Sequence, residues 1–165
     1  MIALDLIVDR VVDFGVRHVT VTGGEPLAQP NVLDLLTALC DRGLTVSLET
    51  SGALSVAEVD ARVVKVVDFK TPGSAEVSRN LWENTRHLLA HDQVKFVLCS
   101  REDYEWARMQ CAQYDLHEQV AEVLFSPSYG QLDATQLADW IVADRAPVRM
   151  QVQLHKLLWG DEPGR

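Results

Sequence analysis

The sequence predicts an α/β fold with a parallel sheet, and three features of its hydrophobic pattern support this. Helical spacing of apolar residues alternates with short strand-like runs, giving six helix–strand pairs along 165 residues. The connections are short, so strands separated by helices should lie parallel with right-handed crossovers. The nearly continuous apolar run over residues 63–69 indicates a sheet that is covered on both faces or closed into a barrel.

The first three helix–strand pairs follow from apolar spacing and from the residues that interrupt it. In each expected helix the apolar residues recur every three or four positions, and Gly15 and Gly43 end two of the helices. The expected strands are short and rich in Val, Thr or Leu. The expected segments are helix 4–14, strand 18–22, helix 32–44, strand 45–49, helix 56–62 and strand 63–69.

The remaining pairs continue the same alternation. Ser100 is the expected N-cap of the fifth helix, with Asp103 three residues further on. The expected segments are helix 79–90, strand 93–98, helix 102–115, strand 120–125, helix 135–143 and strand 148–154. Because the chain opens on a helix and a barrel of βα units opens on a strand, we expect a first strand and its loop to be missing. Residues 1–165 are expected to form a single domain.

Charge and hydropathy limit the partners of the protein. The formal net charge is −9, from 24 acidic against 15 basic residues, so the surface should repel nucleic-acid phosphates and suit a small molecule or a protein. No apolar run approaches the roughly 18 residues of a membrane span. The N-terminal segment carries acidic residues at Asp5, Asp9 and Asp13, which a secretory signal peptide would lack. We therefore expect a cytoplasmic protein.

Polar residues follow every expected strand at its carboxyl end, where parallel α/β folds bind ligands. The most specific stretch is Thr22-Gly23-Gly24-Glu25-Pro26 after the first strand. Two glycines allow positive φ and close approach of a ligand, and the acid can receive an ammonium group. The alternative is an ordinary strand-to-helix turn. The pattern is neither a dinucleotide fingerprint nor a phosphate-binding loop.

Taken together, the strand-end stretches resemble the radical S-adenosylmethionine (SAM) superfamily, in which GGEP follows the second barrel strand. The chain resembles most closely the 7-carboxy-7-deazaguanine synthases, over some nine-tenths of its length from about residue 16. The similar stretches are TGGEPLAQP, SLETSGA, VVDFKTPGS with a following Asn80, DQVKFVL, REDYEWA, LFSPS, LADWI and QVQLHKLLWGDEPGR. The resemblance implies a partial, TIM-like barrel with helices outside.

The resemblance also implies a lyase that converts 6-carboxy-5,6,7,8-tetrahydropterin to 7-carboxy-7-deazaguanine with loss of ammonia, for queuosine or another 7-deazapurine. In that family a 4Fe–4S cluster cleaves SAM to a 5′-deoxyadenosyl radical, Mg²⁺ assists, and homodimers form. The SAM-binding residues would be Gly23, Gly24, Glu25, Glu49, Ser51, Lys70 and Ser126. The pterin would be bound by Thr22, Gln153, His155 and Arg165.

The chemistry of the two ligands agrees with these roles. SAM carries an ammonium, a carboxylate and a sulfonium, which Glu25, Lys70 and Ser51 can match, and a pterin offers amide edges to polar side chains. Two alternatives stay open: His155 is a packed or solvent-facing histidine, and Lys70 is an ordinary surface residue.

The three cysteines do not form a metal-binding motif. Cys40, Cys99 and Cys111 are widely separated, and we expect Cys40 and Cys99 to be buried free thiols. The family binds its cluster through a CxxxCxxC loop, with a Mg²⁺-binding threonine beside it, and neither is found in this sequence. We therefore expect no metal ligands and no catalytic residues in the chain, and about 30–60 residues missing before it, by the size of a βα unit.

Three interpretations of the function remain from the sequence, and the third, a sibling radical SAM enzyme with another substrate, is opposed by the QLHKLLWGDEPGR ending. In the first, the complete protein is a radical SAM lyase and this chain alone is inactive. In the second, the chain is a non-catalytic remnant or partner subunit that still binds SAM or a pterin.

Overall fold

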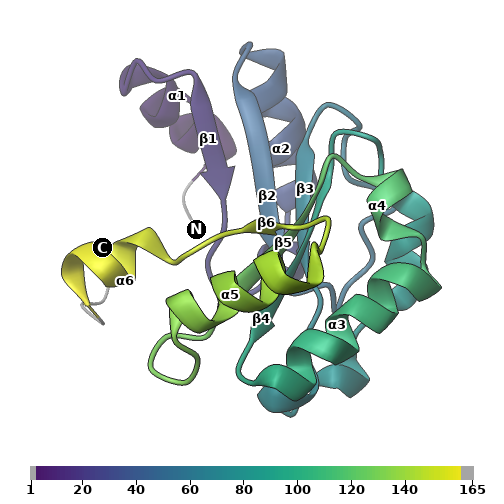
Figure 1. Ribbon diagram of the computed structural model, residues 1–165. Coiled ribbons are helices and arrows are strands. Elements are labelled where there is room, and N and C mark those ends of the chain that lie inside the picture. The colour runs from purple at the N-terminus through teal and green to yellow at the C-terminus, as the bar shows by residue number, and fades with distance from the viewer. Residues whose placement is uncertain (1–2, 161–165) are drawn as a thin grey trace.

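The strands form one open sheet in which every neighbouring pair is parallel. A computed structural model describes residues 3–160, and the strands lie side by side in chain order, with β1 and β6 at the two edges (Figure 1). The strands are β1 His18–Val21, β2 Thr45–Thr50, β3 Val64–Asp68, β4 Gln93–Leu98, β5 Glu122–Pro127 and β6 Arg149–Met150. The expected parallel α/β fold, a partial TIM-like barrel, is confirmed.

Helices and 3-10 turns connect the strands. The α-helices are α1 Leu4–Asp13, α2 Val32–Asp41, α3 Arg101–Gln113, α4 Leu116–Gln119, α5 Ala134–Asp144 and α6 Leu154–Trp159. The 3-10 turns are η1 Pro26–Ala28, η2 Pro72–Ser74, η3 Val77–Arg79 and η4 Trp82–His87. Ser100 caps α3 by accepting a hydrogen bond from the Asp103 backbone N–H, as expected. None of the described helices is long and apolar enough to cross a membrane.

Alternation along the strands gives the sheet two different faces. In β4, Val94, Phe96 and Leu98 are fully buried in the hydrophobic core, against which the helices pack. Lys95 points to the opposite face because successive side chains in a strand alternate. In register on that face, Asp68 of β3 lies beside Lys95. The core face therefore builds the fold, and the polar face is available for ligands.

The expected helices 56–62 and 79–90 are wrong. The first segment is a series of turns, and η3 and η4 take the place of the second. Asn84 accounts for the loss of helix in both segments. Its buried amide accepts a hydrogen bond from Val56 N and donates to the Gly52 and Leu54 carbonyl oxygens. Such bonds from a side chain to the backbone compete with helical ones.

The expected last strand, 148–154, is mostly wrong. Only Arg149 and Met150 pair with β5, and one further bond joins Gln151 N to Phe125 O at 2.9 Å. The chain then turns into α6, which extends away from the sheet in Figure 1. Leucine and lysine are strong helix formers, so the LHKLLW stretch favours a helix once the edge pairing ends.

A buried ion pair closes the amino-terminal end of the sheet. Lys65 Nζ lies 2.8 Å from an Asp92 carboxylate oxygen, and their side chains are 2% and 0% exposed. Asp92 also accepts hydrogen bonds from the backbone N–H groups of Lys65 and Leu89, both at 2.7 Å. Each carboxylate oxygen is thus satisfied by the protein itself.

Candidate functional site

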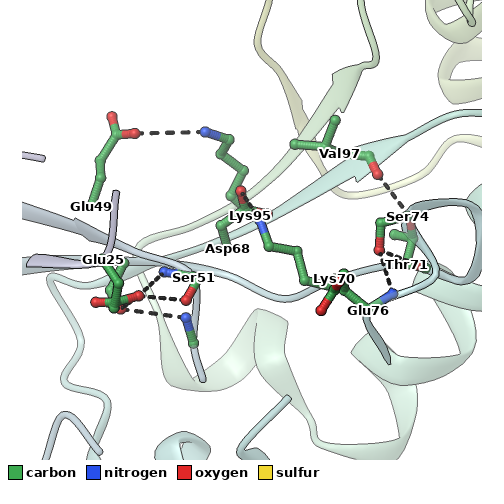
Figure 2. A network of polar contacts seen from close by, with 12 residues as sticks. Glu25, Glu49, Ser51, Asp68, Lys70, Thr71, Ser74, Glu76, Lys95 and Val97 are labelled. Carbon is green, nitrogen blue, oxygen red and sulfur yellow. Dashed lines mark hydrogen bonds and ion pairs between the residues drawn. The ribbon is translucent and has the colours of Figure 1, made fainter. Parts of the chain in front are cut away.

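Glu25 lies at the carboxyl-terminal rim and joins the loop after β1 to the end of β2. One of its oxygens accepts a hydrogen bond from Thr50 Oγ1 at 2.8 Å, and the other accepts one from Ser51 N at 2.9 Å. The Ser51 hydroxyl and the Leu27 N–H also donate to this carboxylate. Figure 2 shows Glu25 directed toward Ser51. The structure therefore brings two of the predicted SAM-binding residues into direct contact.

These hydrogen bonds keep Glu25 ionised. Burial alone would raise its pKa, but the bonds from Ser51, Thr50 and Leu27 outweigh burial and hold the pKa below the ordinary value. The rim therefore carries a fixed negative charge near neutral pH.

Gly23 and Gly24 form the turn that places Glu25. Their φ angles are 100° and 56°, a region that strongly favours glycine. Within the described part of the chain, no heavy atom beyond the immediate neighbours lies within 4 Å of where a Cβ would stand. The turn is open on this side, so a ligand can approach its backbone. Thr22 and Gly23 line a pocket of about 430 Å³ together with Leu4 and other residues of α1, η1 and α2.

Lys70 follows β3 on a firmly held loop. Its Nζ lies 3.0 Å from Asp68 Oδ2, and the Asn80 amide clamps its backbone by bonding both Lys70 N and Lys70 O. The buried Asp103 carboxylate holds the rest of the loop through Thr71 Oγ1 at 3.1 Å and Gly73 N at 2.8 Å. Gly73 is required there, since an added Cβ would stand 2.4 Å from Asp103 Oδ2.

A second pocket, the central pocket, opens on the polar face of the sheet beside β6. It measures about 300 Å³ and is lined by Glu49, Lys95, Ser126, Gln151 and Gln153, among others. Lys95 Nζ lies 3.7 Å from Glu49 Oε2, and the two side chains reach toward each other across β3 (Figure 2). The structure thus brings Glu49 and Ser126, predicted for SAM, together with Gln153, predicted for the pterin.

Sequence reasoning missed three residues of this region: Asp68, Lys95 and Gln151. The signal for Lys95 was present, because alternation in QVKFVL places it on the face opposite the apolar side chains. The other two had a signal as well, because Asp68 stands near the carboxyl end of the expected strand 63–69 and alternation in QVQ places Gln151 on the same face as Gln153.

Several buried polar atoms near the central pocket have no hydrogen-bond partner among the described residues. Ser126 Oγ, Gln151 Oε1 and Asp68 Oδ1 make no hydrogen bond within residues 3–160. The Ser126 residue is only 1% exposed. Because buried polar groups are normally paired, these atoms fit a polar ligand that supplies both donors and acceptors. SAM and a pterin both meet this requirement.

Two of the remaining predicted pterin residues cannot be placed in the site. His155 lies in α6, but its side chain is outside what the structure describes. Arg165 lies outside the described residues altogether.

The cysteines do not fit an iron–sulfur cluster. Cys40 and Cys99 are half-buried, which corrects the expectation of full burial, and Cys111 is the buried thiol. Burial raises the pKa of all three, that of Cys111 to about 12, so none is a ready thiolate. Among the described residues no group of three or more cysteine, histidine, aspartate or glutamate side chains could hold a metal ion.

Fold and site together define the class of the protein: an open, TIM-like barrel of parallel strands with pockets at the carboxyl-terminal rim. Known structures agree on the fold. The structure of SuiB from Streptococcus suis bound to S-adenosylmethionine matches with a TM-score of 0.62 at 14% identity, over 89% of this chain and 40% of SuiB. None of the protein-family models compared with the chain matches it.

Curated relatives identify the family. A 7-carboxy-7-deazaguanine synthase from Chlorobaculum tepidum is 41% identical over 96% of this chain and 73% of its own length. One from Koribacter versatilis is 38% identical over 87% of this chain and 70% of its own length. The chain belongs to the 7-carboxy-7-deazaguanine synthase family, which confirms the resemblance.

Proposed function

We propose that the protein acts in the formation of 7-carboxy-7-deazaguanine from 6-carboxy-5,6,7,8-tetrahydropterin with loss of ammonia, and that this chain binds SAM and the pterin. The observation that carries the proposal is the single rim formed by strand-end residues in a chain 41% identical to such a synthase. SAM, when bound, would supply the radical chemistry of the family.

SAM would lie against the turn after β1. The Gly23 and Gly24 backbone is open to a ligand, and its carbonyl groups could accept N–H bonds from the SAM ammonium. Glu25 already accepts bonds from Thr50, Ser51 and Leu27, so we assign it two tasks: negative charge beside the ammonium, and orientation of Ser51.

The remaining SAM-binding residues would lie along the neighbouring strands. Lys70 supplies a cation whose backbone Asn80 fixes, and Glu49 and Ser126 line the central pocket. For the pterin we propose Thr22, Gln153, His155 and Arg165, as the family resemblance implies. Gln153 lines the central pocket with Ser126, which supports adjacent sites for the two ligands.

The chain by itself does not fit the metal groups of the family. The three cysteines stand in α2, after β4 and in α3, and no group of three or more cysteine, histidine, aspartate or glutamate side chains in residues 3–160 could hold a metal ion, so the described residues provide no cysteine site for a cluster. We therefore propose that this chain alone performs no radical step. The same observation favours a second candidate, a SAM- or pterin-binding module or partner subunit. We further propose a homodimer, as in the family.

Ligand binding and turnover separate the two candidates. Calorimetry should show SAM binding, and Ser51→Ala should weaken it about fivefold, since one hydrogen bond is worth roughly 1 kcal/mol. Ser55→Ala is the matched control, because Ser55 is exposed and bonds only locally to Ala57 N within the described structure.

The protein is then reconstituted anaerobically with iron and sulfide and given a reductant, SAM and the tetrahydropterin. Turnover would establish the enzyme and overturn inactivity of the chain. SAM binding without turnover is expected of this chain under both candidates. The same assay on the protein with any preceding coding sequence included separates them, because turnover there supports the lyase and SAM binding alone supports the binding module. Absence of binding to both ligands would overturn both candidates.

A further inference from the structure

We infer that Lys95 binds a ligand carboxylate in the central pocket. In the absence of the ligand Glu49 pairs with the Lys95 ammonium, and the ligand carboxylate displaces Glu49 on binding. The inference rests on the proposed function, because it assigns a role within the same cleft. Both proposed ligands carry the required group: SAM has a methionine carboxylate, and the pterin has a 6-carboxylate.

The position of Lys95 is set by the fold. Its neighbours Val94 and Phe96 are fully buried in the core and fix the strand, so the lysine must point into the cleft on the other face. There its side chain is 13% exposed and lines the central pocket. A cation withdrawn from water to this extent requires an anionic or strongly polar partner.

The partner that the protein supplies is loose. The 3.7 Å between Lys95 Nζ and Glu49 Oε2 is longer than a hydrogen bond. By contrast, the two other lysine–carboxylate pairs within the described sheet and its ends measure 2.8 Å for Lys65 and 3.0 Å for Lys70. The Glu49 side chain is 41% exposed, so it can turn toward water at low cost. Glu49 is therefore a replaceable partner for Lys95.

Neighbouring donors complete a carboxylate site. Ser126 is 1% exposed on β5, and its hydroxyl has no partner in the described chain, so it is free to donate. The Gln151 amide lies in the same pocket and carries a donor beside its acceptor oxygen. A carboxylate accepts about four hydrogen bonds, which an ammonium, a hydroxyl and an amide can provide.

Because Glu49 and Lys95 carry opposite charges, we expect Glu49→Gln and Lys95→Met to change the affinity for a carboxylated ligand in opposite directions. Glu49 repels an incoming carboxylate and competes for Lys95, so Glu49→Gln should strengthen binding of a carboxylated ligand several-fold. Lys95→Met should weaken it about 10- to 100-fold, the range for a charged hydrogen bond. The SAM-binding role given to Glu49 under the proposed function predicts the reverse, so Glu49→Gln decides between that role and displacement of Glu49 by the ligand carboxylate.

Two pairs of ligands test the inference and identify the source of the carboxylate. Binding of pterin-6-carboxylate is compared with that of pterin by fluorescence, and SAM with decarboxylated SAM by calorimetry. Lys95→Met should reduce the preference for the carboxylated member in one pair, and Lys95→Arg should keep part of that preference. Arg86→Met removes an equal charge from a 76% exposed side chain and should leave both preferences unchanged.

Each outcome decides a separate point. A reduced preference between the pterins assigns Lys95 to the substrate acid, and a reduced preference between the SAM compounds assigns it to SAM. If Lys95→Met, folded by circular dichroism, keeps both preferences, the inference is wrong and the proposed function stands. If it does not fold, Lys95→Gln provides the same comparison. Failure of the wild type to bind either carboxylated ligand would overturn the proposed function as well.

Discussion

Two lysine–carboxylate pairs on opposite faces of one sheet show how packing decides what an ion pair does. Lys65 and Asp92 are almost completely buried and 2.8 Å apart, and backbone N–H groups fill the remaining sites on the carboxylate. Lys95 and Glu49 are 3.7 Å apart beside a pocket, with Glu49 partly in water. In the first pair every carboxylate oxygen has a hydrogen-bond partner, and the pair stabilises the fold. In the second pair the Lys95 ammonium is held only loosely, and we propose that it can bind a ligand.

The largest expected effect is at the complete pair. Asp92→Ala leaves Lys65 as a buried, unpaired cation and should lower the free energy of unfolding by about 3–5 kcal/mol. Urea denaturation measures this change. Glu49→Ala is the comparison variant and should cost less, about 1 kcal/mol, because its pair with Lys95 is long at 3.7 Å and partly exposed, and Asp68 stays beside Lys95 as a second carboxylate. If both variants lost the same unfolding free energy, the proposed difference between the Lys65–Asp92 and Lys95–Glu49 pairs would be wrong. Should Asp92→Ala fail to fold, Asp92→Asn should show a smaller loss of the same sign.

Asp103 is a second carboxylate that the protein fills completely. It accepts hydrogen bonds from Thr71 Oγ1, Gly73 N and Cys99 N. Asp103→Ala should lower the free energy of unfolding by about 2–3 kcal/mol, as buried donors lose their acceptor. It should also weaken SAM binding by releasing the loop that carries Lys70. Asp103→Asn keeps one acceptor oxygen, so its loss of unfolding free energy should be smaller than that of Asp103→Ala. Unchanged stability in the alanine variant would show that other contacts hold the loop.

Glu25 lies between the two extremes and gives the smallest effect, a dependence on pH. Its pKa is lowered in the folded protein, so its ionisation stabilises the fold above the ordinary glutamate pKa of about 4.3. That contribution is lost as the pH falls below about 4.3 and through the lower folded pKa. The difference in unfolding free energy between wild type and Glu25→Gln should shrink from pH 7 to pH 3. A difference that grows on acidification would show that the pKa is raised instead.

Local sequence pattern was sufficient for most of the fold. The strand 93–98 and the Ser100 cap follow from alternation and from one side chain bonding the next turn, and both were predicted correctly. The segments 56–62 and 79–90 failed because the Asn84 amide bonds backbone groups about 30 residues away. No local pattern contains such a bond, and so helix propensity was overridden.

For the site, the sequence by itself determined which residue types reach the rim: the glycine turn before Glu25, the hydroxyls of Ser51 and Ser126, and the cation of Lys70. Strand ends and period-two alternation are local properties, and they fix these positions. Only the tertiary structure decided which groups are already satisfied. Asp92, Asp103 and Glu25 receive donors from distant segments, whereas Lys95 and Ser126 face a cavity, because pairing depends on packing across strands far apart in the chain.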